Sequence, residues 1–199
     1  MTIKTYSEAC ERNRGPILSV ISPLLLNCHA LLEIGSGNGQ HAVYFAERLP
    51  HLIWYTSDVR ENHPDIRAWL GEAGLSNIRD PLPLDVKRDA WPELEIDAVF
   101  SANTAHIMHW DEVKLFFAGV GRSLPENGKF LLYGPFNYNQ AYTSESNARF
   151  DVWLKARDPE SGIRDFESLN EVAGNAGMEL IDDYEMPANN RILYWRKSR

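Results

Sequence analysis

Three glycines at alternate positions, Gly35, Gly37 and Gly39, follow an apolar run that contains one acidic residue, Glu33. This pattern is typical of a buried parallel strand that turns sharply into a helix. Glycine at such a turn adopts positive φ, or lets the backbone approach a ligand where a Cβ would clash. The helix that we predict over residues 40–48 would point its free N–H groups at whatever lies over the loop. The sequence therefore predicts a ligand site at this turn.

The spacing of the glycines indicates which ligand. A dinucleotide-binding turn reads G-x-G-x-x-G and a P-loop ends in G-K-[ST]; here the third glycine comes one position early and no lysine follows. The stretch from Glu33 to Gly39 resembles instead the first motif of Rossmann-like S-adenosylmethionine (SAM) methyltransferases. SAM has no phosphate but a zwitterionic tail and a sulfonium cation, so an acidic residue suits it where a lysine would not. We expect the glycines, Glu33 and His41 to bind this cofactor.

Acidic residues also follow the next two predicted strands. Asp58 follows strand 52–57 and Asp85 follows a weaker strand, 82–84. Because ligands in open α/β sheets lie outside the carboxyl ends of the strands, these acids should converge with the glycine turn. Asp58 would accept both ribose hydroxyls, at about 1.5–3 kcal/mol for each charge-assisted bond. Asp85 and the backbone of Val86 would bind the adenine amino group. The alternative for any single one of these acids is that it is a solvent-exposed residue at a strand end without a ligand.

The segment after the fourth predicted strand carries the candidate catalytic groups. Asn103 would lie beside the methionine part of the cofactor, and His106 is either a general base or a structural histidine. His106, His109 and Asp111 together suggest a metal site, but this spacing recurs by chance and no second ligand cluster accompanies it. We therefore predict no metal.

Strands and helices alternate from residue 30 onward, which is typical of a parallel sheet covered on both faces. Residues 6–27 precede it as one or two helices broken at Gly15-Pro16. The link between the last two strands is too short for a crossover, so these strands should pair antiparallel. The predicted strands are 30–34, 52–57, 82–84, 96–101, 129–133, 179–184 and 191–196, and the helices 40–48, 64–73, 110–124, 147–157 and 166–175. This is an α/β fold with seven strands, mostly parallel with one antiparallel, as in class I SAM methyltransferases.

Several further segments resemble one family along nearly the whole chain. They are Glu11-Arg-Asn-Arg14 with Pro16, Asn103 to His106, Tyr133-Gly-Pro-Phe136, Glu145-Ser-Asn147, Phe150-Asp151, Arg157-Asp-Pro159, Gly162-Ile-Arg-Asp165 and Met186-Pro-Ala-Asn-Asn190. The chain thus resembles the domain-of-unknown-function 938 family, which includes relatives of methyltransferase-like protein 26. The resemblance implies a SAM methyltransferase fold and supplies no substrate.

The segments outside the generic fold should select the substrate. We expect one domain over residues 1–199, with residues 1–28 as a helical lid and 134–165 as a substrate-side insertion. Arg14 in the lid could clamp a carboxylate of the cofactor or of a substrate. Four residues could form a partly aromatic acceptor pocket, with Tyr133 also positioning the reaction: Tyr133, Phe136, Asn137 and Tyr138.

Composition excludes several functional classes. The net charge is −8, and the basic residues are scattered apart from residues 196–199, so we expect no nucleic-acid partner. The most apolar window, residues 17–32, is interrupted by Pro23, Asn27 and His29, so we expect no membrane span. The two cysteines do not have the spacing of a metal site, and reduced thiols are usual in the cytoplasm, where we expect the protein. The expected activity is SAM-dependent methyl transfer to a small molecule; a protein methyltransferase and a non-catalytic SAM-binding adaptor or sensor are the alternatives. Nothing in the sequence specifies the oligomeric state.

Overall fold

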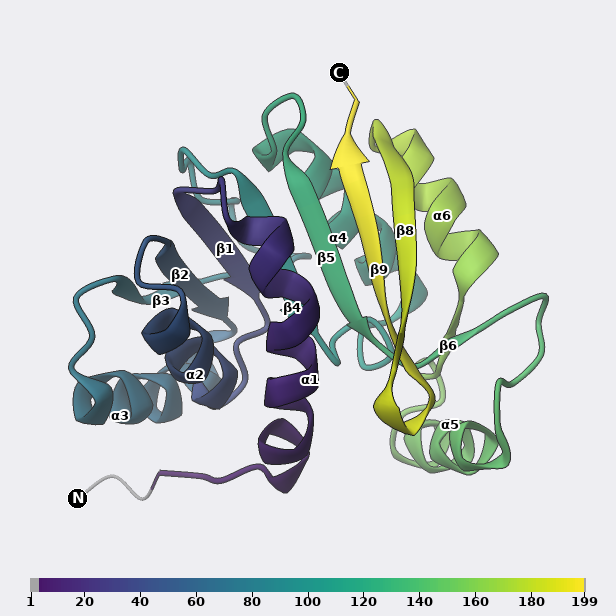
Figure 1. Cartoon of the computed structure of the whole chain (residues 1–199). Helices are drawn as coiled ribbons and strands as arrows, with labels where there is room; N and C mark the ends of the chain where they lie inside the picture. Colours follow the sequence, from purple (N-terminus) through teal and green to yellow (C-terminus); the bar gives the residue numbers. More distant parts are fainter. Residues whose placement is uncertain (1–3, 199) are drawn as a thin grey trace. The chain divides into compact units, whose positions relative to one another are not determined.

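The structure is a computed structural model that describes residues 4–198. Residues 1–3 of the predicted lid and residue 199 of the basic C-terminal cluster lie outside the described residues. The described chain divides into two compact parts, which we call unit 1 (up to Ser101) and unit 2 (from Ala102). The elements up to the boundary are α1 Glu8–Leu25, β1 Ala30–Ile34, α2 Gln40–Arg48, β2 Ile53–Asp58, α3 His63–Ala73, β3 Ile78–Pro83 and β4 Ala98–Ala102 (Figure 1). Those beyond it are α4 Trp110–Ser123, β5 Lys129–Gly134, β6 Phe136–Asn137, α5 Glu145–Arg157, β7 Arg164–Asp165, α6 Phe166–Asn175, β8 Met178–Met186 and β9 Asn190–Lys197.

Seven strands form one sheet in the order β3-β2-β1-β4-β5-β9-β8, and β6 pairs with β7 in a separate two-stranded ribbon. β1 is parallel to β2 and to β4, and β2 is parallel to β3. β9 is antiparallel to both β5 and β8, which confirms the predicted antiparallel pairing at the end of the chain. The predicted α/β fold, with seven strands of which one is antiparallel to its neighbours, is therefore confirmed.

The third strand was placed wrongly by the sequence, because β3 runs over Ile78–Pro83 rather than over residues 82–84. Its residues include an arginine, an aspartate and two prolines, and they show no clear strand pattern. β3 lies at the edge of the sheet, where a proline can be accommodated because one side of the strand makes no ladder bonds. This segment is a strand because it pairs with β2, beginning with Trp54 opposite Ile78.

The predicted break at Gly15-Pro16 is also wrong, because α1 runs without interruption from Glu8 to Leu25 through Pro16 and Pro23. An interior proline costs a helix about 3 kcal/mol. Three side chains at four-residue spacing, Ile17, Ile21 and Leu25, are fully buried along one stripe of α1. Burying an aliphatic side chain contributes about 1.5–3 kcal/mol, so the three side chains of the stripe together are comparable with the cost of the two prolines.

The core of unit 1 contains three aromatic side chains in mutual contact. The ring centroids of Phe45 and Trp54 are 5.6 Å apart, and those of Trp54 and Phe100 are 6.0 Å apart. Helices α2 and α3 pack on each other and on strands of this unit (Figure 1). These rings thus join α2, β2 and β4 in the core of this unit.

Unit 2 has its own aromatic core. Phe117 and Phe130 lie with their ring centroids 5.3 Å apart, and Phe130 stacks on Trp195 at 5.5 Å. The indole N–H of Trp195 donates to Asn170 of α6 at 3.0 Å, which satisfies the polar atom of the buried ring. Helix α6 packs against both α4 and β8.

Within the described residues, no helix is both long and apolar enough to cross a membrane.

Replacing Ile21 tests whether α1 is held by its buried stripe. We expect Ile21→Ala to lower the free energy of unfolding by about 2–5 kcal/mol, since the side chain is fully buried. Val20→Ala, one position away and only partly buried, is the control and should cost clearly less. Urea unfolding followed by circular dichroism measures both. Similar small losses in the two variants would contradict a structural role for the stripe.

Candidate active site

The glycine turn has the backbone geometry that its sequence predicts. Gly35, Gly37 and Gly39 have φ of 73°, 62° and 89°, in the left-handed region. The N–H groups of Gly35 and Ser36 both donate to the carbonyl of Ser57 at 3.0 Å, so the turn is tied to β2. A Cβ at Gly39 would lie 3.1 Å from the Cα of Ile66 in α3. The third glycine is therefore required both by its φ and by a close backbone approach.

Asp58 connects the turn to the segment that follows β2. Its Oδ2 accepts the N–H of Gly37 at 2.7 Å, and its Oδ1 accepts the N–H of Val59 at 2.7 Å and the Nδ2 group of Asn62 at 2.9 Å. Burial raises the pKa of Asp58, while these hydrogen bonds act in the opposite direction. The predicted ribose-binding acid thus lies directly against the middle glycine.

Glu33 lies inside unit 1, with 1% of its surface exposed. Its Oε2 accepts the indole N–H of Trp54 at 3.1 Å. Burial raises the pKa of Glu33 to about 7, and the charge of Asp58 adds to the effect. Near neutral pH the carboxyl group is therefore divided between its acid and its carboxylate.

The first turn of α2 is in contact with α1. The Nε2 atom of His41 lies 2.7 Å from Oδ1 of Asn13, and the Sγ atom of Cys10 lies 3.9 Å from Nδ1 of the same ring. Burial lowers the pKa of His41 to about 4, helped by the charge of Arg14. Arg14 itself pairs with Glu11, and its guanidinium lies 4.4 Å from the centroid of the Tyr44 ring. The N-terminal part of α1 thus covers the beginning of α2.

Asp85 is two residues beyond the end of β3. Leu84 donates its N–H to the carbonyl of Asp58 at 3.0 Å, so Asp85 still follows the carboxyl end of β2. Its Oδ1 accepts the N–H of Lys87 at 2.9 Å, and Arg88 lies 3.7 Å from its Oδ2. Val86 is partly exposed in the same turn. Both residues stay candidates for the adenine end of a nucleoside.

In unit 2, Asn103 and His106 lie in the segment that follows β4. Asn103 adopts a φ of 60°, and its N–H donates to the carbonyl of Tyr133 at 2.9 Å. His106 is 6% exposed, and no hydrogen bond to either of its ring nitrogens is found within the described residues. Burial lowers its pKa to about 4, with a further contribution from the charge of Arg164. The imidazole is therefore neutral at physiological pH.

Two of the predicted pocket residues lie near His106. A Cβ at Gly134 would lie 3.7 Å from the ring of Phe136 and 3.9 Å from Nδ1 of His106, so both side chains border this glycine. Tyr133, which precedes it, is buried. Tyr133, Phe136 and His106 are thus placed by the end of β5 and the segment after β4.

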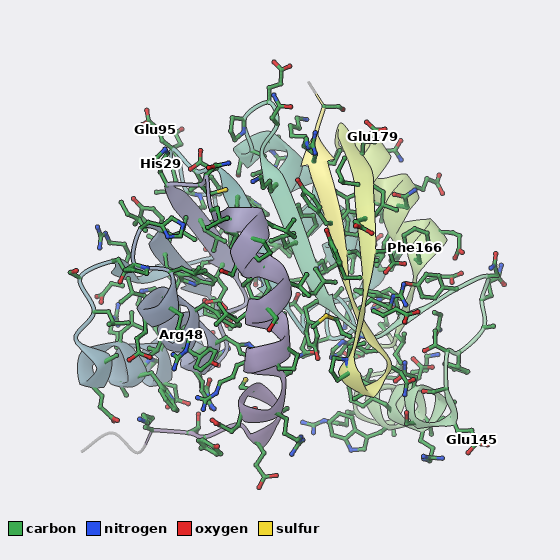
Figure 2. The ribbon with its side chains drawn as sticks, viewed as in Figure 1. His29, Arg48, Glu95, Glu145, Phe166 and Glu179 are labelled. Carbon is green, nitrogen blue, oxygen red and sulfur yellow. The ribbon has the colours of Figure 1, made fainter. Side chains whose placement is uncertain are left out.

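Asn137 and Tyr138 differ from each other. The Oδ1 atom of Asn137 is the single buried side-chain polar atom without a hydrogen-bond partner in the described part of the chain. Tyr138 instead donates its hydroxyl to Asp183 at 2.7 Å and stacks on Phe166, which is labelled in Figure 2, at 5.2 Å. Tyr138 therefore has a structural role in this arrangement, whereas Oδ1 of Asn137 is able to accept a hydrogen bond.

Both ring nitrogens of His109 contact acidic side chains of the segment after α5. Its ring nitrogens lie 2.7 Å from a carboxylate oxygen of Asp158 and 2.8 Å from one of Glu160, and its pKa is raised chiefly by the bond with Asp158. Residues 4–198 hold no cluster of three or more His, Cys, Asp or Glu side chains that could bind a metal ion.

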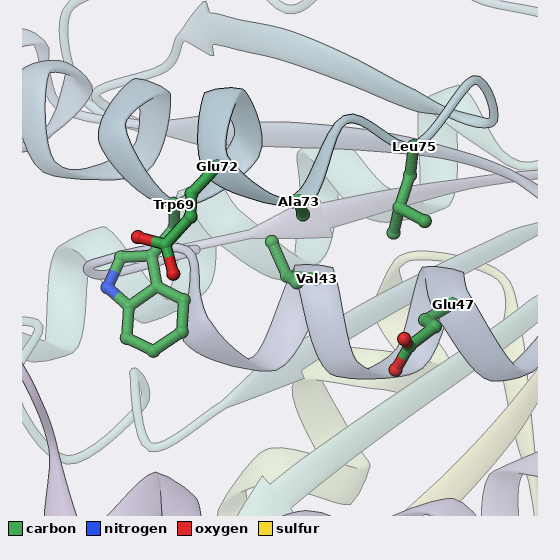
Figure 3. A pocket seen from close by; sticks show the side chains of 6 residues that line it. All are labelled: Val43, Glu47, Trp69, Glu72, Ala73 and Leu75. Atoms are coloured by element: carbon green, nitrogen blue, oxygen red, sulfur yellow. The ribbon is translucent and has the colours of Figure 1, made fainter.

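A pocket of ≈ 190 Å³ lies between α2 and α3 (Figure 3). The Nζ atom of Lys4 lies 3.6 Å from the centroid of the Trp69 ring and pairs with Glu72 at 2.8 Å. None of the predicted site residues lines this pocket, whose walls are Val43, Glu47, Trp69, Glu72, Ala73 and Leu75. A cation from the chain's own N-terminal segment thus already contacts two of its walls.

Sequence reasoning missed three polar partners of the site. Asn62 bonds to Asp58 and Trp54 bonds to Glu33, but a single Asn or Trp at those positions carries no signal by itself. Arg164 belongs to a segment that the family resemblance includes, yet its bonds to the segment after β4 join residues more than fifty positions apart.

A comparison with models of protein families shows to which family the chain belongs. The model of a family described as "Protein of unknown function (DUF938)" matches residues 4–197. The chain belongs to the DUF938 family. This confirms the family expected from the sequence.

Solved structures of methyltransferases share the fold of this DUF938 protein. An O-methyltransferase family protein from Burkholderia thailandensis is 15% identical with a TM-score of 0.82, and the match covers 96% of this chain and 58% of that one. The S-adenosylmethionine-dependent methyltransferase SibL is 19% identical with a TM-score of 0.81, over 96% of this chain and 56% of SibL. An O-methyltransferase family 2 protein from Planctomyces limnophilus, solved with apigenin, is 16% identical with a TM-score of 0.75, over 84% and 50%. The DUF938 chain therefore spans little more than half the length of these proteins.

Buried Glu33 predicts a pH dependence of stability. Its pKa in the folded protein, about 7, is above the ordinary value of 4.5, so between these values the folded state keeps a proton that the unfolded state loses. Its contribution to stability therefore falls as pH rises through this window. Relative to wild type, Glu33→Gln should gain about 3 kcal/mol in the free energy of unfolding between pH 4.5 and 7.

Urea unfolding of the ligand-free protein at several pH values measures this difference. Glu95→Gln, a change at an exposed position labelled in Figure 2, is the control and should follow the wild type at every pH. A constant difference between Glu33→Gln and wild type would show that Glu33 does not titrate in this window.

Proposed function

We propose that this DUF938 protein is a SAM-dependent methyltransferase that acts on a small molecule. The observation that carries the proposal is the contact between Asp58 and the N–H of Gly37, at 2.7 Å, in a fold that known methyltransferases share. This contact places a carboxylate at a strand end beside a glycine turn, which suits a ligand with a diol next to a polar tail. The name of SibL, which states SAM dependence, supports the same cofactor.

The residues of unit 1 fit such a cofactor. A Cβ at Gly37 would meet no atom within 4 Å, so the backbone of the turn is accessible on that side. Asp58 already accepts three hydrogen bonds, and a carboxylate has about four acceptor positions. Binding both ribose hydroxyls therefore requires one present donor to give way, and the side chain of Asn62 is the most mobile of the three. His41 would be neutral and would not repel a sulfonium cation.

Unit 2 contains residues of its own that suit an acceptor molecule. SAM, when bound, supplies a methyl group attached to a positively charged sulfur. The protein's task is to orient the acceptor and to exclude water, and orientation alone can supply roughly 7–11 kcal/mol of the barrier. In our proposal Tyr133 and Phe136 form the apolar walls, and Oδ1 of Asn137 accepts a hydrogen bond from the acceptor molecule.

His106 is proposed as the base that removes a proton from the acceptor. With a pKa of about 4 the imidazole is neutral and ready to accept a proton. It is a weak base, but an oxygen or nitrogen that is gaining a methyl group becomes strongly acidic, so a weak base can take its proton late in the reaction.

A small-molecule acceptor is favoured over a macromolecule. The net charge of −8 and the lack of a basic cluster in the interior of the sequence do not suit nucleic acid. The groups proposed to face the acceptor, His106 and Phe136, are 6% and 2% exposed, which suits a ligand that enters the protein better than a protein surface. The Planctomyces limnophilus protein was solved with apigenin, a small molecule.

Variants of Asp58 test the cofactor. We expect Asp58→Ala to weaken SAM binding by roughly 10²–10⁴-fold, because two charge-assisted bonds of about 1.5–3 kcal/mol each are lost. Asp58→Asn keeps an acceptor for Gly37 but loses the charge, and it should weaken binding as well. Titration calorimetry with SAM and with S-adenosylhomocysteine measures the affinity, and Asp80→Ala, on an exposed part of β3, should bind like wild type.

Two results would contradict the proposal at different levels. Failure of the folded wild-type protein to bind SAM would exclude the cofactor. Binding of SAM without formation of S-adenosylhomocysteine from any metabolite or protein pool would favour a non-catalytic adaptor, and product formation with proteins alone would favour a protein methyltransferase.

Variants of His106 test the base once an acceptor is found. We expect His106→Ala to lower kcat by about 10²–10⁴-fold, the usual contribution of a general base, with SAM affinity unchanged. Because the base is active when neutral, the wild-type rate should stay constant down to about pH 5 and fall as pH approaches 4. An unchanged kcat in the variant would assign His106 a structural role.

A further inference from the structure

The turn that carries His106 has two local hydrogen bonds, from the N–H groups of Ile107 and Met108 to the carbonyl of Thr104, and is otherwise held by a segment distant in sequence, residues 158–164. Four consecutive carbonyls of this turn, those of residues 105–108, accept hydrogen bonds from it. The N–H of Gly162 donates to His106 at 2.9 Å and the hydroxyl of Ser161 donates to Ile107 at 2.8 Å. Arg164 donates to the other two, with its Nε 3.1 Å from the carbonyl of Ala105 and its Nη2 bonded to that of Met108. The turn is thus fixed at each residue by contacts from outside itself.

Arg164 makes the two outer contacts with one rigid group. The planar guanidinium presents its donors in a fixed fork, so the carbonyls of Ala105 and Met108 are held at a set separation on either side of His106. The same Nη2 atom also donates to the carbonyl of Glu160 at 2.9 Å, which joins the fork to its own segment. A lysine in its place would have a single nitrogen and could not reach both carbonyls in this geometry.

The segment that presents Arg164 is itself anchored by Asp151 of α5, which is 1% exposed. Oδ1 of Asp151 accepts the N–H of Ile163 at 2.7 Å, while Oδ2 accepts the hydroxyl of Tyr142 at 2.7 Å and the ammonium of Lys155 at 2.6 Å. A Cβ at Gly162 would lie 2.8 Å from this carboxylate, so only glycine fits there. The position of Arg164 is therefore set by a buried charge and not by a flexible loop.

His109, just after this turn, makes further contacts with the same distant segment. Its two ring nitrogens contact Asp158 at 2.7 Å and Glu160 at 2.8 Å, in the same segment that holds the carbonyls. The ring of His106 also packs edge-on against Phe150 of α5, with centroids 5.2 Å apart. α5 and the segment after it thus surround the candidate base.

We propose that Arg164 is a positioning residue for His106. It holds the turn at residues 105–108 in place, so that the imidazole stays buried beside Gly134 and Phe150. The inference rests on the proposed function for the catalytic meaning of His106, but the positioning itself can be measured without cofactor or acceptor. It also assigns a role to the Gly162-Ile-Arg-Asp165 segment.

The test compares Arg164→Met, Arg164→Lys and Arg157→Met in the ligand-free protein by NMR. The control residue, Arg157, belongs to the same helix-and-loop region but is exposed, and its guanidinium lies 4.6 Å from the centroid of the Trp153 ring. The readouts are the titration of the His106 ring and the hydrogen exchange of the amide of Gly162. Arg164→Met should move the titration of His106 upward from about 4 toward the ordinary value of 6.5, and should speed exchange at Gly162 by about tenfold or more.

Arg164→Lys separates geometry from charge. If the fork positions the turn, the lysine variant should resemble Arg164→Met in the exchange of Gly162, although it keeps the positive charge near His106. If Arg164 acts by charge alone, the lysine variant should behave like wild type in both readouts, and that result would overturn the proposal.

Two further outcomes complete the test. Wild-type behaviour of a folded Arg164→Met protein in both readouts would also overturn the positioning role. SAM calorimetry on the same proteins keeps the two proposals apart: lack of SAM binding by wild type would refute the methyltransferase, whereas the NMR result would still decide whether Arg164 positions His106.

Discussion

The carboxylate of Asp58 makes the contacts on which the glycine turn of unit 1 depends. It joins the middle of the glycine turn to the first residues after β2, through the N–H groups of Gly37 and Val59 and the side chain of Asn62. A turn of three residues with positive φ has few backbone bonds of its own, so a buried acceptor beside it fixes its shape. In the same unit, buried Glu33 bonds to Trp54, whose ring packs on Phe45. The same carboxylate that would bind a ribose therefore also shapes the turn.

Burial keeps the polar groups of the candidate site close to neutral. His41 and His106 have pKa values of about 4, and Glu33 has a pKa of about 7, in each case chiefly because burial disfavours the charged form. A site for a sulfonium cation benefits from this arrangement, since neutral histidines do not repel the ligand and a partly ionised carboxyl group can respond to it. The charged groups nearby, such as Arg14, are already paired with acids or rings.

Unit 2 shows how an irregular segment can be as well fixed as a helix. The turn at residues 105–108 has no strand or helix of its own, yet each carbonyl has a donor from residues 161–164. Functional side chains commonly lie on such segments, where a rigid scaffold determines their position. Here the scaffold is the predicted substrate-side insertion, which places the candidate base through backbone contacts rather than by touching its ring nitrogens.

The sequence by itself determined the features that depend on neighbouring residues. β1, α2 and α6 have the predicted bounds, because hydrophobic periodicity and the glycine turn mark them locally. The glycine turn and Asp58 were also found, since positive φ and strand ends leave a signal in a few adjacent residues. Tertiary structure decided the rest: β3 is a strand because β2 pairs with it, and α1 continues through Pro16 because its stripe is buried. It alone joined Arg164 to Met108 and His109 to Asp158, because hydrogen bonds between residues some fifty positions apart leave no periodic or local pattern in a single sequence.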